Sequence, residues 1–133
     1  MLREISISYQ SKVGRMDYIN PKRATQDVVV SLVVSDAELT AKGYDLVATG
    51  VRTQEELNAA DYDPAKAYTK LYQSDRLQIG YKLEACKITS LPNGEHLPVG
   101  DYEMLLIIDA YDPETFEKAA VNAQAPVTVH IVD

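Results

Sequence analysis

The feature that most constrains the fold is a two-residue alternation of apolar side chains, which is clearest in the last third of the chain. Residues 101–111 carry four apolar side chains on one face of an extended segment: Tyr102, Met104, Leu106 and Ile108. A turn sequence at Asp112-Pro113 follows, and residues 126–132 alternate again. Because successive side chains of a strand point to opposite faces, the pattern predicts strands with one buried face.

The same alternation predicts further strands in the first part of the chain and again after residue 69. They cover residues 4–9, 13–18, 25–36, 70–74 and 79–88. Strands at short spacing, with turn residues between them, are typical of an antiparallel two-sheet sandwich. We therefore expect residues 1–133 to form a single all-β domain, an immunoglobulin-like sandwich.

Residues 37–69 interrupt this pattern, and we call them the insert. Within the insert, Thr53 and Glu56 match a helix capping box, which predicts a short helix over residues 53–60. Val29 and Val33 stand on the face opposite to the predicted core, so that one sheet would carry an apolar outer centre. Either the insert or a partner covers such a centre. We expect the insert to do so through Leu46, Val47, Val51 and Leu57.

Charge and hydropathy exclude two classes of partner. The chain has 20 acidic and 13 basic residues, a net charge of −7, and no basic stripe that would attract nucleic acid. No apolar run approaches the roughly 20 residues of a membrane-spanning helix, so we expect no membrane insertion. Residues 1–6 show strand-like alternation and no signal-peptide pattern. This leaves a cytosolic protein or an exported protein whose signal has been removed.

Residues able to support catalysis are few and are not arranged in a known pattern. Cys86 is the only thiol, and His96 and His130 are the only imidazoles. Nucleophilic catalysis needs a base beside the nucleophile, and no local signature pairs these residues. We therefore predict that the chain is not an enzyme.

Oxygen ligands for calcium are the one metal-binding possibility that the sequence offers. Asp109, Asp112 and Glu114 combine hard carboxylate ligands around one turn, and calcium prefers such ligands. Asp-Pro turn chemistry explains the same residues without a metal. We therefore expect no cofactor and keep calcium at these three residues as the alternative.

Tyrosine is unusually abundant, with nine residues against one phenylalanine and no tryptophan. Tyr44, Tyr62 and Tyr68 lie in the insert and are the candidate ligand-binding residues. Tyrosine rings combine apolar area with a polar tip, which suits recognition of a protein or a surface glycan. In the alternative interpretation, these rings cover the edge of the sandwich.

A family resemblance rests on residues 97–102, which read Leu-Pro-Val-Gly-Asp-Tyr before a hydrophobic strand. This segment resembles the penultimate strand of bacterial immunoglobulin-like and fibronectin-III-like domains, which have an L-x-x-G-x-Y pattern there. The Tyr-Asp-Pro-Glu-Thr turn and the terminal strand are similar to C-terminal domains of uncharacterised surface or secreted proteins of Gram-positive bacteria. In such folds a tyrosine near the start of that strand bonds back to the corner backbone, and Tyr102 is the matching position.

The resemblance implies a non-catalytic module of a bacterial extracytoplasmic protein, secreted or at the cell surface. Its expected role is scaffolding, adhesion or protein–protein interaction. The alternative is a carbohydrate-binding module that uses the tyrosine-rich surface, with calcium as an assisting ion. The sequence carries no signal for the oligomeric state.

Overall fold

The computed structural model describes residues 3–120 and 122–133. Within these residues the elements are β1 Glu4–Ser8, β2 Val13–Ile19, β3 Asp27–Ser35, α1 Asp36–Ala41, α2 Gln54–Leu57, β4 Tyr68–Gln73, β5 Lys82–Lys87, β6 Gly100–Tyr111 and β7 Ala123–Val132. Strands dominate and the helices are short, which confirms the all-β prediction at this level.

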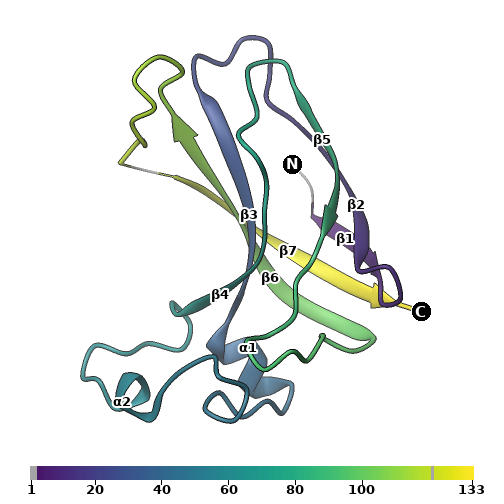
Figure 1. The fold of residues 1–133 in the computed structure, drawn as a ribbon, viewed down its shortest axis with the longest axis vertical. Coiled ribbons are helices and arrows are strands. Elements are labelled where there is room, and N and C mark those ends of the chain that lie inside the picture. The colour runs from purple at the N-terminus through teal and green to yellow at the C-terminus, as the bar shows by residue number, and fades with distance from the viewer. Residues whose placement is uncertain (1–2, 121) are drawn as a thin grey trace.

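The strands form one sheet in the order β4-β3-β6-β7-β1-β2-β5, which curls into a half-barrel (Figure 1). Neighbouring strands are antiparallel except for β1 and β7, which run parallel with Ile5 opposite Val129. The prediction of a wholly antiparallel fold is therefore wrong at this pair, and the predicted division into two sheets is not confirmed, because the seven strands are hydrogen-bonded in one continuous sheet. Alternation reports which face of a strand is buried, and it carries no information on strand direction.

The parallel β1–β7 ladder joins two halves of the sheet. One half contains β4, β3, β6 and β7, and the other contains β1, β2 and β5. The two edge strands of the sheet are β4 and β5. There the N–H of Thr89, just after β5, donates to the carbonyl oxygen of Leu71 in β4 at 2.9 Å. The segment after β5 thus meets β4, and the two halves enclose one interior.

That interior holds the faces that the alternation predicts. The buried cluster includes the predicted inward residues of β3 and β6: Val28, Val30, Leu32, Val34, Tyr102, Met104, Leu106 and Ile108. Val129 of β7 belongs to the same cluster, as do Ile7 of β1, Met16 of β2 and Cys86 of β5 from the other half. The cluster therefore draws on both halves of the sheet, and it is a single core in the described residues.

The insert closes the end of the half-barrel, where Figure 1 shows α1 and α2. Leu46 and Val51 are buried within the core cluster, and Leu57 packs against it. Val29 and Val33 are buried too, but they lie outside this cluster, on the other face of β3. The prediction that these insert residues cover the outer apolar centre is therefore wrong, because Leu46, Val51 and Leu57 pack into or against the core cluster and Val47 is 44% exposed.

The capping box of α2 is present as predicted, although the helix is shorter than residues 53–60. The Thr53 hydroxyl accepts from the N–H of Glu56 at 3.1 Å, and the Glu56 carboxylate accepts from the N–H of Thr53 at 2.9 Å. Helix α1 is absent from the sequence prediction. Its N-cap is Ser35, the last residue of β3, whose hydroxyl accepts from the N–H of Glu38.

Strand β5 starts later than the predicted residue 79, because the chain turns at Gly80 with φ of 86°. Ile79 and Tyr81 precede the strand and are exposed. The core-facing residue of β5 is Cys86, which is buried together with Ile88 just after the strand.

Candidate functional site

An open groove of about 810 Å³ lies along β1, β2 and β5. We call it the β1–β2–β5 groove. Its apolar side chains are Val13, Tyr18, Ile19, Leu83 and Ala85, and its charged side chains are Arg15, Asp17, Lys82 and Glu84. Ser6 and Ser8 of β1 add hydroxyl groups. The buried residues Ile5 and Ile7 of the same strand do not line it, whereas Tyr18 and Leu83, which do line it, pack against the core cluster.

The path of β2 shapes the groove. Pairing with β5 shifts register between Arg15 and Tyr18, and Asp17 within this irregularity has a φ of 48°. Such a bulge bends a strand and increases its twist. Nearby, β1 and β2 approach so closely that a Cβ at Gly14 would lie 2.6 Å from Cγ1 of Ile7. Glycine at this position therefore lets the two strands pair.

The chemistry of the groove suits binding. Arg15 Nε donates to Oδ2 of Asp17 at 2.9 Å, so these opposite charges stand next to each other on the surface. Exposed apolar side chains flank them, since Val13 is 40% and Ile19 is 44% exposed. No residue lining the groove is Cys or His, so the hydroxyls of Ser6 and Ser8 have no imidazole beside them in this groove.

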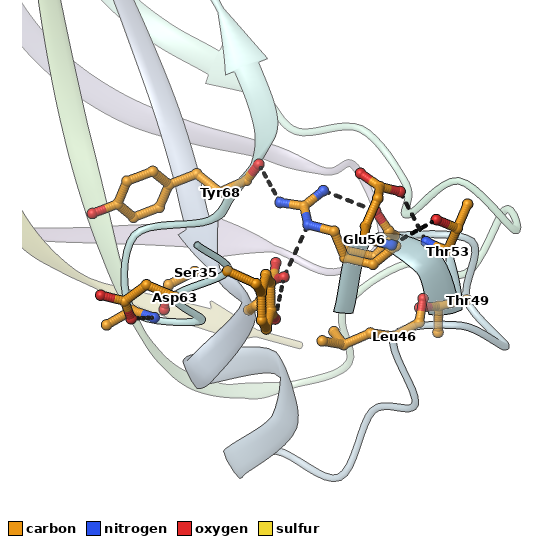
Figure 2. A network of polar contacts seen from close by, with 12 residues as sticks. Ser35, Leu46, Thr49, Thr53, Glu56, Asp63 and Tyr68 are labelled. Carbon is orange, nitrogen blue, oxygen red and sulfur yellow. Dashed lines mark hydrogen bonds and ion pairs between the residues drawn. The ribbon is translucent and has the colours of Figure 1, made fainter. Parts of the chain in front are cut away.

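A second polar arrangement, the Asp36 network, consists of Asp36, Arg52 and Tyr62. The Asp36 side chain is fully buried, and its Oδ2 accepts from Arg52 Nε at 2.9 Å and from the Tyr62 hydroxyl at 2.7 Å. Arg52 also donates to the carbonyl oxygens of Val51 at 2.8 Å and Tyr68 at 3.2 Å. Figure 2 shows the surroundings, with Tyr68 on one side and the α2 capping box on the other.

The Asp36 network joins parts of the chain that are far apart in sequence. Asp36 begins α1 directly after β3, Arg52 precedes α2, and Tyr68 begins β4. Desolvation, followed by the hydrogen bond to Asp36, raises the pKa of Tyr62 to about 12. Because three nitrogen atoms of Arg52 donate inside the protein, the network positions the insert on the end of β3 and β4.

The three candidate tyrosines do not form one platform. The Tyr62 hydroxyl is bound to Asp36, and the backbone of Tyr68 contacts Arg52 while its ring is 36% exposed. Tyr44 is half-buried and packs against the core. The pKa of Tyr44 is raised, mainly because its hydroxyl is desolvated and secondarily because Glu95 and Tyr9 lie nearby. The groups around Tyr44 therefore differ from those around Tyr62. The structure thus brings Tyr62 and Tyr68 to one network and places Tyr44 in another environment.

Two of the three candidate calcium ligands, Asp109 and Asp112, contact protein groups. Asp112 Oδ1 accepts from the backbone N–H of Glu114 at 2.8 Å and of Thr115 at 3.0 Å. These two hydrogen bonds lower the pKa of Asp112, and the bond from Thr115 has the larger effect. Asp109 Oδ1 lies 3.5 Å from Nζ of Lys118. In the described part of the chain no three His, Cys, Asp or Glu side chains are grouped to hold a metal ion, so calcium stays a prediction without a formed site.

The sequence prediction missed the His130 cluster, in which His130, Asp101 and Glu4 meet across three strands. His130 Nδ1 lies 2.7 Å from Oδ1 of Asp101 on β6, and its Nε2 lies 3.0 Å from Oε1 of Glu4 on β1. The pKa of His130 is raised by these two hydrogen bonds, most by the one to Asp101 and next by the one to Glu4. Alternation placed His130 on the outer face of its strand. The partners follow only from the pairing of β7 with both β6 and β1.

Tyr102 makes a backbone contact of the kind that the resemblance of residues 97–102 implies for it. Its hydroxyl donates to the carbonyl oxygen of Pro98 at 2.8 Å, just before β6 begins. The ring is 3% exposed, and its burial, followed by Tyr44 and Glu38, raises the pKa of Tyr102 to about 12. The bond holds the corner through which the chain enters β6.

These features define a β-rich half-barrel domain with an open groove along β1, β2 and β5, a buried polar network at its end and a histidine cluster on its outer face. Comparison with protein-family models, with curated proteins and with solved structures gave no significant match. Among the described residues, none of the helices has the length and apolar character needed to cross a membrane.

Proposed function

We propose that this chain is a non-catalytic, immunoglobulin-like module that binds a protein partner through the β1–β2–β5 groove. The observation that carries the proposal is the composition of the groove. Exposed apolar side chains alternate there with charges of both signs, and none of the lining residues is Cys or His. Such a mixture of apolar and polar groups is typical of protein-recognition surfaces.

The strand order supports the immunoglobulin-like part of the proposal. In variable-type immunoglobulin sandwiches, strands A, B and E share one sheet, and strands C′, C, F and G share the other. Matching β1, β2 and β5 to A, B and E, and β4, β3, β6 and β7 to C′, C, F and G, agrees with the neighbours in each half. In this assignment the parallel β1–β7 ladder is where the two sheets meet.

The Tyr102 contact supports the same assignment independently. A tyrosine corner places a tyrosine near the start of strand F, with its hydroxyl bonded to backbone a few residues upstream. Tyr102 near the start of β6 donates to the carbonyl of Pro98 in this way. The match involves a specific side-chain contact as well as the order of the strands.

A protein partner suits the groove better than a glycan. Sugar recognition by this chain was expected to use a surface of tyrosine rings, and Tyr62 has its hydroxyl bound to Asp36 instead. The groove contains one aromatic residue, the half-buried Tyr18. The paired charges of Arg15 and Asp17 would match a partner surface that also carries both signs.

The cellular setting of the module is part of the proposal and rests on the resemblance of residues 97–102. We place the domain in a bacterial extracytoplasmic assembly, where it would act in scaffolding or adhesion. Fractionation of cells that express the native gene, with antibody detection of the chain, tests this location. Recovery only in the cytosolic fraction would contradict it.

Selection from a displayed peptide library tests the groove. Peptides that bind the wild-type domain are measured against the double variant Val13→Asp/Ile19→Asp and against Val99→Asp, a control at a side chain that is 56% exposed and does not line the groove. We expect the Kd to rise at least about tenfold for the groove variant, which loses two apolar contacts and gains charge. The control should bind like the wild type. Peptides that bind all three proteins equally would contradict the proposed site.

A further inference from the structure

The β1–β7 ladder is a short connection between the two halves of the sheet. It pairs five residues of each strand, from Glu4 opposite Thr128 to Ser8 opposite Val132. Backbone bonds extend it at both ends, from the N–H of Thr128 to the carbonyl of Arg3 and from the N–H of Tyr9 to the carbonyl of Val132. A side-chain contact across this ladder therefore acts at the junction of the two halves.

His130 makes such a contact in both directions. In the sheet, His130 pairs with Asp101 on β6 and with Ser6 on β1. Its two ring nitrogens reach carboxylate oxygens of Asp101 at 2.7 Å and of Glu4 at 3.0 Å. A neutral imidazole has one N–H donor and one acceptor nitrogen, whereas an ionised carboxylate only accepts. Both contacts can therefore be hydrogen bonds only when the imidazole is protonated.

We propose that His130 is a pH-sensitive switch at the junction of the two sheet halves. Protonated His130 bonds to Asp101 and Glu4 and so fastens β1 to β7 and β6. Loss of the proton replaces one hydrogen bond with a repulsive contact between a nitrogen lone pair and a carboxylate. The β1–β7 ladder then opens more readily, while the β3–β6 ladder keeps its stability.

The charged groups around His130 are nearly all acidic. Asp101 faces it from β6 and Glu4 faces it from β1, while Glu103 of β6 lies opposite the neighbouring Thr128. Glu103 contacts the neighbouring Thr128 hydroxyl at 3.1 Å, and its N–H donates to the carboxylate of Glu38 in α1. Within residues 3–120 and 122–133, neither Asp101 nor Glu4 forms an ion pair with a Lys or Arg. The protonated imidazole is thus the positive partner in this cluster.

The direction of the pH effect follows from these neighbours. The bonds to Asp101 and Glu4 raise the folded-state pKa of His130 above its ordinary value of 6.5. A group whose pKa is raised on folding stabilises the folded state fully below its unfolded pKa. That contribution is lost as the pH rises through the raised, folded-state pKa. The hydrogen bonds of His130 therefore stabilise the β1–β7 ladder most in mildly acidic solution.

Hydrogen exchange measured at several pH values tests the switch on the intact chain. After correction for intrinsic exchange rates, we expect protection of the β1–β7 amides to fall roughly two- to fivefold as His130 loses its proton, because exposed pairs contribute little each. Amides of β3 and β6 should not follow this change. In the variant His130→Gln the β1–β7 protection should no longer depend on pH in this range. His96→Gln, at an exposed turn position, is the matched control and should behave like the wild type.

Titration of the two imidazoles by NMR gives a second, independent measurement. We expect a midpoint for His130 above its ordinary value of 6.5, and a lower His130 midpoint in the variant Glu4→Gln. A His130 midpoint at or below 6.5 would overturn the proposal. So would β1–β7 protection that changes with pH equally in the wild type and in His130→Gln.

Discussion

Arg52 Nε lies 2.9 Å from Oδ2 of Asp36, and the Asp36 side chain has no exposed surface. The pair connects the first residue of α1 with the segment just before α2, and Tyr62 adds a second donor to the same oxygen. Asp36 Oδ1 is buried without a hydrogen-bond partner among the described residues. A buried carboxylate of this kind depends on the partners that it has, because an isolated buried charge is costly.

The first prediction concerns the loss of this ion pair. The variant Arg52→Met leaves the buried Asp36 carboxylate without its cation and should lower the free energy of unfolding by about 3 kcal/mol. Urea denaturation measures the change. Arg15→Met is the matched control, because the Arg15–Asp17 pair is 82% and 58% exposed and exposed pairs contribute at most about 1 kcal/mol. If the two substitutions lowered the free energy of unfolding equally, the burial of Asp36 would add nothing to the stabilising effect of its ion pair.

The second prediction concerns alkaline pH. The pKa of Tyr62 is raised from 10.0 to about 12, first by desolvation and then by its bond to Asp36. Its stabilising contribution is therefore complete below pH 10 and is lost as the pH rises towards 12. The melting temperature of the wild type should fall more steeply across this pH interval than that of Tyr62→Phe. Tyr68→Phe, with its exposed ring, should keep the wild-type slope.

The third prediction concerns the corner at the start of β6. Tyr102→Phe removes the hydroxyl that donates to the carbonyl oxygen of Pro98 and leaves the buried Tyr102 ring without this tie to the corner. We expect a loss of about 1 kcal/mol in the free energy of unfolding. Tyr81→Phe tests the same chemical change at a ring that is 59% exposed, and it should have almost no effect. Indistinguishable denaturation curves for these two variants would remove the corner bond from the argument for an immunoglobulin-like fold.

The fourth prediction concerns the insert as part of the core. Leu46 is 8% exposed within the core cluster, whereas the adjacent Val47 is 44% exposed. Leu46→Ala should therefore lower the free energy of unfolding by about 2 kcal/mol or more. Val47→Ala should change it by less than about 0.5 kcal/mol. If the insert were an independent flap, both substitutions would leave the denaturation midpoint of the sheet unchanged.

Local patterns in the sequence were sufficient for several features. The inward faces of β3 and β6 follow from alternation, because each side chain's face depends only on its position along an extended strand. The capping box of Thr53 and Glu56 follows from residues three apart. The contact of Tyr102 with Pro98, which the resemblance of residues 97–102 implies, joins residues four apart. In each case the interacting groups are close in sequence, so the pattern contains the information that the structure uses.

The remaining features depend on partners that are distant in the chain. The parallel pairing of β1 with β7 brings Glu4 to His130, and no periodicity in either segment specifies that direction. The insert carries apolar residues that suit either face of the sheet, and the tertiary structure packs Leu46, Val51 and Leu57 into or against the core cluster. The sequence alone determined which residues are buried in most strands, because burial follows local alternation. The tertiary structure alone decided which strands are neighbours, and with them the groove and the His130 cluster, because those contacts join segments that only the folded chain brings together.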